Sequence, residues 1–151
     1  MNRIVLLLIV LLVACKDSQN NSSQAHDVLG RWKTGCFSDE VVDYWVTTEY
    51  VFLDDHVQQI SHVFEDEECT AGIGNSSGGP VVSEGEYFFI RNEITVDGLT
   101  ADIYGQYFLS QILSEVSELG LFVEGDVLYL VHQNSNGYYV NFDIPFYRVV
   151  E

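Results

Sequence analysis

Short segments rich in valine, tyrosine and phenylalanine follow one another from Val28 to the end of the chain, separated by turn residues. These residue types are enriched in β-strands, and the turn signals recur at the spacing of an all-β sandwich or barrel. The clearest turns are Asp54-Asp55, Arg91-Asn92, Asp97-Gly98, Gly125-Asp126 and Asn136-Gly137. Since about eight such strands leave unpaired edges unless the sheet closes, we expect an all-β, antiparallel up-and-down barrel. Strand alternation alone fits a sandwich equally.

One stretch departs from the strand pattern. Within residues 110–120, Ile112, Leu113, Val116 and Leu119 have helical spacing, Ser110 can cap the first turn and Gly120 can end the last. The pattern predicts one short helix, and a loop followed by a strand is the alternative. Residues 66–79 are too rich in glycine and serine for regular structure and are expected to form a loop.

The first 14 residues have the features of a secretory signal peptide. Arg3 precedes an unbroken apolar run from Ile4 to Val13, and Ala14 is a small residue before Cys15. Ten apolar residues span about 15 Å as a helix, half of a hydrocarbon core of about 30 Å, so the run is too short for a membrane anchor. We expect a signal peptide at 1–14, a polar linker at 15–27 and one folded domain at 28–151.

The segment Leu12-Val13-Ala14-Cys15 resembles the lipobox of bacterial lipoprotein precursors. The resemblance implies that Cys15 carries lipid, becomes the mature N-terminus and attaches the protein to a membrane of the bacterial cell envelope. Lys16 stands where an aspartate favours inner-membrane retention in that family, so the outer membrane is favoured. An ordinary signal peptide followed by a stray cysteine is the alternative.

If Cys15 carries lipid, Cys36 and Cys69 remain as a pair in an oxidising compartment, where a disulfide is expected. The alternative is two buried free thiols.

The chain has 6 basic and 23 acidic residues, a formal net charge of −17. Such a surface repels phosphate backbones, so we expect no nucleic-acid partner.

Gly30-Arg31-Trp32 fits the Gly-x-Trp signature that opens lipocalin-like barrels. Together with the segments 35–37, 50–55 and 62–70, it is similar to the adenomatosis-polyposis-coli-down-regulated domain, a lipocalin-related β fold. The similarity covers about the first third of the folded body. It implies that Trp32 plugs the closed barrel end and that Cys36 and Cys69 are bridged. In lipocalins a late arginine lies against this tryptophan, and the resemblance to them implies that Arg148 stacks on Trp32. A surface arginine on the last strand is the alternative for Arg148.

Few residues are arranged for catalysis or metal binding. Residues 74–78 match Gly-x-Ser-x-Gly, but a glycine-rich loop lacks the strand and helix that a nucleophile elbow requires. The four histidines have no recognisable ligand spacing, and the acidic run at 65–68 lacks the spaced oxygens of a calcium loop. We predict no catalytic residues, no metal site and no cofactor, and therefore a protein that is not an enzyme.

The aromatic content leaves ligand binding as the leading hypothesis, because small barrels either fill with side chains or hold one small ligand. Alternation suggests an inner face of Tyr44, Tyr50, Ile60, Phe64, Tyr87, Phe89, Tyr107, Tyr129 and Tyr138. His62 and Thr48, if inward, would make the pocket polar. From these we select Tyr44, Tyr50, His62, Tyr87, Tyr107 and Tyr129 as candidate contacts for a small apolar or amphipathic ligand. The alternative function is a filled barrel that binds another envelope protein or has a structural role.

Overall fold

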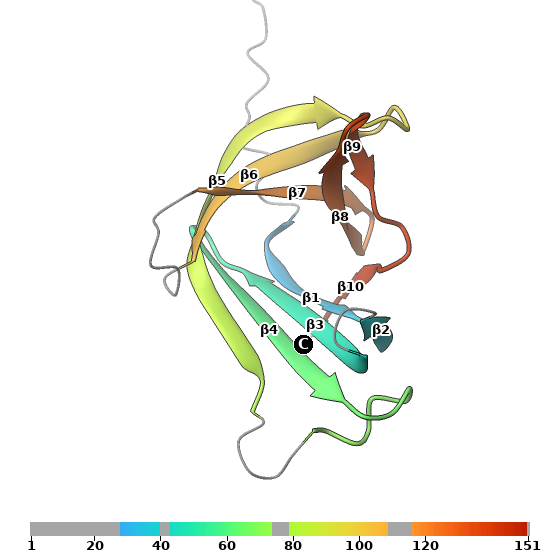
Figure 1. The fold of residues 1–151 in the computed structure, drawn as a ribbon. Helices are drawn as coiled ribbons and strands as arrows, with labels where there is room; N and C mark the ends of the chain where they lie inside the picture. Colours follow the sequence, from blue (N-terminus) through green and yellow to red (C-terminus); the bar gives the residue numbers. More distant parts are fainter. Residues whose placement is uncertain (1–27, 40–42, 74–78, 109–115, 151) are drawn as a thin grey trace, which may run out of the picture.

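The computed structural model describes residues 28–39, 43–73, 79–108 and 116–150, and its regular elements are β-strands (Figure 1). In chain order they are β1 (Gly30–Thr34), β2 (Phe37–Asp39), β3 (Tyr44–Phe52), β4 (His56–Phe64), β5 (Val81–Ile94), β6 (Thr100–Phe108), β7 (Ser117–Glu124), β8 (Val127–Asn134), β9 (Gly137–Val140) and β10 (Phe146–Arg148). The predicted signal peptide, Cys15 and the linker lie outside the described residues. Within the described ranges, no helix has the length and apolar character needed to cross a membrane.

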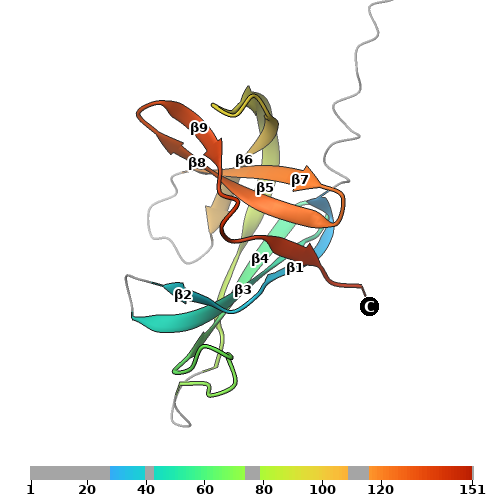
Figure 2. The same ribbon diagram turned by 90° about the vertical axis from the view of Figure 1, so that its right-hand side faces the viewer.

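The sheet closes into a barrel because β1 pairs on both of its edges. The strand order is β1-β10-β8-β7-β6-β5-β4-β3-β2, every pairing is antiparallel, and β1 also pairs with β3. Two short strands lie off this ring: β2 pairs with the first residues of β3, and β9 pairs with the last residues of β8. They lie apart from one another in both views of the ribbon (Figures 1 and 2). The predicted closed up-and-down barrel is therefore confirmed, and the sandwich alternative is wrong.

The helix predicted over residues 110–119 is a strand in its described part. Ser117–Glu124 forms β7, which pairs with β6 on one side and β8 on the other. Leu119 and Leu121 are buried on the same face, which is the two-residue period of a strand. The loop-and-strand alternative is confirmed from Ser117 onward, because two ladders of hydrogen bonds outweigh a short run of helical spacing. Residues 109–115 lie outside the described ranges.

A sharp bend in β5 gives the barrel its shape. The first part of this strand pairs with β4 and the second part with β6. Gly85 lies where the two pairings overlap, and a Cβ atom there would be 1.9 Å from the carbonyl oxygen of Tyr107. Glycine is therefore required for the backbones to approach at this point. The bend carries β5 from one end of the molecule to the other (Figure 1).

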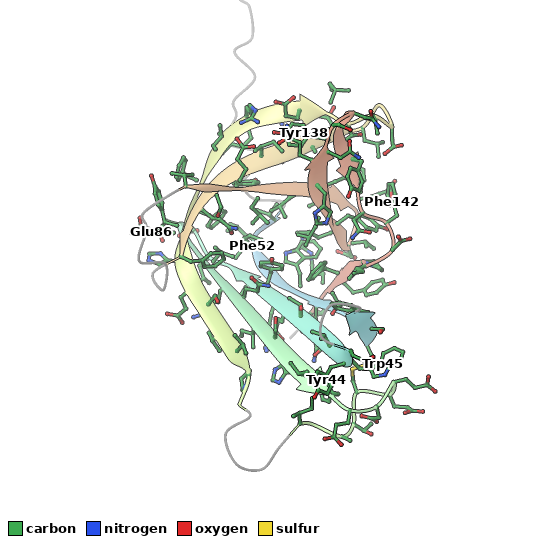
Figure 3. All side chains as sticks on the ribbon, in the orientation of Figure 1. Tyr44, Trp45, Phe52, Glu86, Tyr138 and Phe142 are labelled. Carbon is green, nitrogen blue, oxygen red and sulfur yellow. A yellow bond between two sulfur atoms is a disulfide. The ribbon has the colours of Figure 1, made fainter. Side chains whose placement is uncertain are left out.

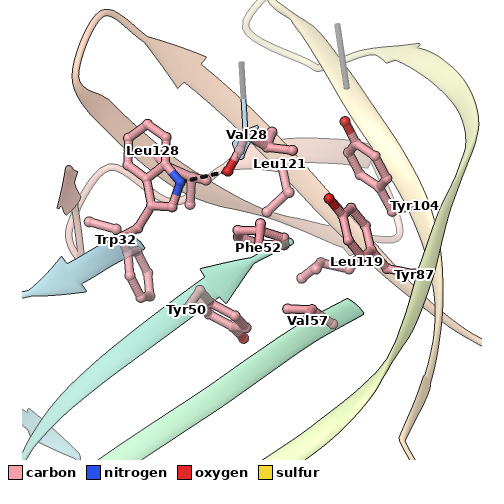
Figure 4. Close-up of a cluster of buried hydrophobic side chains, with 11 residues drawn as sticks. Val28, Trp32, Tyr50, Phe52, Val57, Tyr87, Tyr104, Leu119, Leu121 and Leu128 are labelled. Atoms are coloured by element: carbon pink, nitrogen blue, oxygen red, sulfur yellow. Dashed lines mark hydrogen bonds between the residues drawn. The ribbon is translucent and has the colours of Figure 1, made fainter. Parts of the chain in front are cut away.

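One end of the barrel, here called the closed half, is filled by a hydrophobic core (Figure 4). Each strand of the eight-stranded ring contributes at least one side chain to it. Its buried members are Val28, Trp32, Tyr50, Phe52, Val57, Tyr87, Tyr104, Leu119, Leu121, Leu128 and Phe146. Burying a large apolar side chain contributes roughly 1.5–3 kcal/mol, so this cluster is the main source of apolar stabilisation in the described fold.

A second, smaller cluster lies on the outer face of β7 and β8. Residues directly opposite in an antiparallel ladder share a face, and neighbouring pairs alternate between faces. Because Leu121 faces the closed half, the adjacent pair Phe122 and Tyr129 faces outward. These two rings pack against a buried group of Ala101, Val131 and Val140. The β8–β9 hairpin therefore has its own core outside the barrel.

Candidate functional site

Beyond the hydrophobic core, hydroxyl and carboxamide side chains replace apolar ones on the inner face. Tyr50 belongs to the core, so its ladder partner Gln59 also faces inward, and Gln59 places its own partner Ser83 inside. The same rule applied around the ring places the apolar side chains of Val46, Val63 and Val81 on this inner face, together with a set of polar side chains that we call the polar belt. It consists of Thr34, Thr48, Gln59, Ser61, Ser83, Gln106 and Ser117. We call the part of the barrel that it lines the open half.

The exposure of inward-facing side chains rises along the barrel. Trp32 and Val57 are fully buried and Thr48 is 8% exposed, whereas Tyr44 and Val81 are 44% and 64% exposed. Tyr44 lies at the end of β3 that is farthest from Phe52 (Figure 3). The inner wall is thus accessible to solvent at this end of the barrel.

The polar belt is only partly satisfied by its own hydrogen bonds. The Thr34 hydroxyl accepts from the Thr48 N–H (2.9 Å) and donates to the Thr48 carbonyl (3.3 Å). The hydroxyls of Thr48 and Ser61 lie 3.3 Å apart and share a hydrogen bond. In contrast, Oε1 of Gln106 is buried and has no hydrogen-bond partner among the described residues. A buried acceptor without a partner costs about 1–3 kcal/mol, so a donor supplied by a ligand would be stabilised here.

Three of the predicted ligand contacts face inward, in different parts of the barrel. Tyr50 and Tyr87 belong to the packed core, where burial raises the pKa of each phenol to about 12. The Tyr87 hydroxyl also donates to the Leu53 carbonyl (2.6 Å). These two rings form the floor below the polar belt, and Tyr44 lies at its rim.

The other three predicted contacts lie on the outer face of the barrel. His62 is opposite Thr47, and because Thr47 is next to the inward-facing Thr48, both side chains of the pair face outward. The His62 ring stacks with the ring of Phe64. Tyr107 is opposite Glu86 and contacts Phe88, while Tyr129 packs in the outer cluster. Their predicted inward placement is wrong because the choice of face depends on strand register, and a shift of one residue reverses it.

The closed end contains the contact that the sequence predicted between Trp32 and Arg148. The guanidinium carbon of Arg148 lies 4.1 Å from the centre of the Trp32 ring, which is fully buried. The indole N–H donates to the Val28 carbonyl (2.7 Å), and Nη1 of Arg148 donates to the Leu29 carbonyl (2.8 Å). Gly30 has φ +115°, and a Cβ there would lie 3.3 Å from Arg148 Nη1, so glycine suits this position on both counts.

The predicted disulfide between Cys36 and Cys69 is confirmed, with Cα atoms 5.8 Å apart. It ties the loop after β4 to the junction of β1 and β2. In that loop, hydrogen bonds from the Thr70 hydroxyl and from the backbone N–H groups of Ala71 and Thr70 lower the pKa of Asp66 below its usual value. The Asp66 carboxylate therefore stabilises a turn.

Among the described residues, no group of histidine, cysteine and acidic side chains is placed to hold a metal ion.

No protein-family model matches this chain, and no curated protein or solved structure shows significant similarity to it.

Apart from Thr48, the residues of the polar belt were missed, because neither face of β4 is uniformly apolar. One face carries Ile60 and His62, and the other carries Gln59 and Ser61. The Asp54-Asp55 turn was the sequence signal that could have predicted the inward face of β4. A two-residue turn there places Phe52 opposite Val57 and therefore Tyr50 opposite Gln59, so that Gln59 shares the face of Tyr50. Gln106 offers no comparable signal, because its face is set by the pairing of β6 with the bent strand β5.

Proposed function

We propose that this protein is a lipid-anchored lipoprotein of the bacterial cell envelope whose lipocalin-like barrel holds a small amphipathic ligand in the open half. The observation that carries the proposal is the change in chemistry along the inner wall. An aromatic floor that includes Tyr50 and Tyr87 suits an apolar group, and the polar belt above it suits a head group with hydrogen-bond donors.

The buried carboxamide oxygen of Gln106 refines the ligand class. It is an acceptor without a partner among the described residues, so it favours a ligand with an N–H or O–H group over a pure hydrocarbon. Gln106 is opposite the core residue Tyr87 on one strand and the belt residue Ser117 on the other. It therefore lies at the boundary where an amphipathic ligand changes from apolar to polar.

The location is proposed from the N-terminal sequence. The lipobox-like residues 12–15 supply a lipid attachment site, and the polar residues after Cys15 supply a leash between bilayer and barrel. The Cys36–Cys69 disulfide supports an oxidising compartment. Lys16 favours the outer membrane.

Native mass spectrometry of gently purified protein tests ligand binding. The wild-type protein should retain a co-purifying molecule, and Gln106→Leu should reduce its occupancy several-fold because the ligand loses its hydrogen-bond acceptor. Gln133→Leu is the matched control, since Gln133 is exposed on β8. Equal occupancy in Gln106→Leu and Gln133→Leu, or a wild-type protein that never carries a bound molecule, would contradict the proposal.

Replacement of Cys15 by serine tests the anchor. The variant should leave the membrane fraction and lose metabolic palmitate labelling, because the thiol is the acylation site in the proposal. Palmitate that stays on the Cys15→Ser protein would show that the lipobox interpretation is wrong.

A second candidate function, a filled barrel that binds an envelope protein, is favoured by one outer surface. Phe88, Tyr107 and Val116 are 45%, 38% and 43% exposed. The side chains of Phe88 and Val116 lie beside Gly105, and the ring of Tyr107 contacts that of Phe88. Exposed apolar groups of this kind are typical of interaction surfaces.

Phe88→Ser with Tyr107→Ser should abolish in-cell cross-links to a partner while leaving the mass of any bound ligand unchanged. Cross-links that survive the double variant would argue against this surface.

A further inference from the structure

The ring of strands has a seam at which two neighbouring strands separate. β1 and β10 pair from Trp32–Arg148 to Thr34–Phe146, and their ladder ends there. Beyond that point the segment after β1 continues through Gly35 into β2. β2 pairs with β3 and not with the segment on the other side of the seam. A pocket of about 160 Å³ lies between the diverging segments. We call it the seam pocket.

The seam pocket is lined by two aromatic residues and one acidic residue, among others. It is formed by Thr34, Gly35, Cys36, Phe37, Asp143, Ile144, Pro145 and Tyr147. Phe37 and Tyr147 come from opposite sides of the seam, and Asp143 supplies the charged group. Lysine, arginine and histidine are absent from the lining. Lys33 is the ladder partner of Tyr147 and lies outside the lining, and its other ladder partner, Glu49, is paired with Arg31.

Both walls of the seam pocket are held by contacts outside it. On the β1–β2 side, Cys36 is bound to Cys69, and Thr34 is hydrogen-bonded to Thr48. On the other side, the Asp143 N–H donates to Oδ1 of Asn141 (3.1 Å), and the Asn141 N–H donates to the Leu130 carbonyl (2.9 Å). The residues that line the pocket are therefore held in place by contacts with the rest of the fold.

The electrostatic setting of the molecule favours a cation in the seam pocket. The chain has a net charge of −17. Arg31, Arg91 and Arg148, the arginines of the described ranges, each lie beside a carboxylate and so add little positive potential. An acidic surface raises the local concentration of cations, and aromatic rings attract a cation held against their faces.

We propose that the seam pocket binds an organic cation of side-chain size, a primary ammonium or guanidinium group on a short apolar stem. Asp143 pairs with the charge, while Phe37, Tyr147 and Ile144 surround the stem. The volume sets the size, because sites for drug-sized molecules measure about 300–1,000 Å³ and this pocket is about half of the lower limit. The site shares Thr34 with the polar belt but takes its charged group and its aromatic residues from elsewhere, so the proposal does not depend on the proposed ligand site.

NMR titration of the full-length ¹⁵N-labelled protein, in nonionic detergent, tests the assignment. n-Butylammonium should shift the amide resonances of Gly35, Cys36 and Tyr147, and the neutral isostere 1-butanol should shift them much less. Asp143→Asn should weaken n-butylammonium binding about two- to five-fold, the range expected for one exposed charge pair. Asp97→Asn, which changes net charge equally at an exposed turn, should change it by less than about 1.5-fold.

Three results would overturn the assignment. They are equal binding of 1-butanol and n-butylammonium, equal weakening by Asp143→Asn and Asp97→Asn, and shifts confined to residues outside the seam. The unchanged spectrum of Asp143→Asn away from the pocket serves as the folding control.

A parallel titration with Nα-acetyl-lysine methylamide distinguishes two sources of the same cation. Binding at least as tight as that of n-butylammonium assigns the pocket to a lysine side chain of a polypeptide, and clearly weaker binding assigns it to a free amine. The Gln106→Leu variant should bind n-butylammonium like the wild-type protein. Failure of the seam assignment is therefore distinguishable from failure of the proposed ligand site.

Discussion

The closed and open halves of the barrel share the same strands but have opposite inner surfaces. In the closed half, Trp32, Phe52 and Leu128 are at most 1% exposed and pack against one another. In the open half, the same inner face carries the polar belt, with a buried Gln106 oxygen that has no partner among the described residues. The difference shows that apolar packing and polar lining are separated along the barrel axis. In the proposed function, polar groups that lower the stability of the empty fold lie where a ligand would compensate them.

The largest expected effect lies in the closed half. Trp32→Ala should lower the free energy of unfolding by about 3–5 kcal/mol, because it leaves a cavity in the core and removes the stacking surface of Arg148. Val81→Ala also removes an inward-facing apolar group, but Val81 is 64% exposed, so we expect a loss below about 0.5 kcal/mol. Urea unfolding measures both. Similar losses would contradict the division into two halves.

Removal of the disulfide should have the next largest effect. The double variant Cys36→Ser/Cys69→Ser should lose about 3–4 kcal/mol by the chain-entropy account, since the bridge spans a separation of 33 residues. Because the bridge belongs to the open half, the hydrogen-exchange protection of Leu128 and Val57 should persist in the folded variant. Loss of that protection at neutral pH would show that the closed half depends on the bridge.

High pH should test the burial of Tyr50. Its pKa is raised to about 12 by burial, so the folded protein keeps the phenol neutral while an unfolded chain ionises it near pH 10. The folded state therefore binds more protons, and this contribution to stability is complete below pH 10 and lost as the pH rises to 12. Tyr50→Phe should remove about 2 kcal/mol of the alkaline decrease. Equal pH slopes in variant and wild type, measured by urea unfolding from pH 9 to 12, would refute the assignment.

The smallest expected effect has the opposite sign and lies in the polar belt. Gln106→Leu should raise the stability of the ligand-free protein by about 1 kcal/mol, because it removes a buried acceptor without a partner among the described residues. Gln133→Leu on exposed β8 should stay within about 0.5 kcal/mol of the wild type. Thermal unfolding measures both. A marked destabilisation by Gln106→Leu would mean that the carboxamide has a structural role instead.

Local sequence patterns predicted much of the barrel. Alternating strands and turn residues predicted the all-β class, and the need to remove unpaired strand edges predicted the closed antiparallel ring. The Gly30-x-Trp32 resemblance predicted the contact of Trp32 with Arg148. The pair of Cys36 and Cys69 followed from cysteine count and compartment. The candidate site was predicted poorly. Of the six selected residues, only Tyr44, Tyr50 and Tyr87 face inward, and the last two belong to the packed core.

The order of polar and apolar residues along the chain determined where strands begin and end, because turn and strand preferences act over a few neighbouring positions. It did not determine which face of a strand lies inside. In β8 the residues from Val127 to Val131 are all apolar, and only the pairing of Leu128 with Val123 shows that Tyr129 points outward. Pairing between distant strands also created the polar belt and the seam pocket. These features belong to the tertiary structure, because inside and outside exist only once the ring has closed.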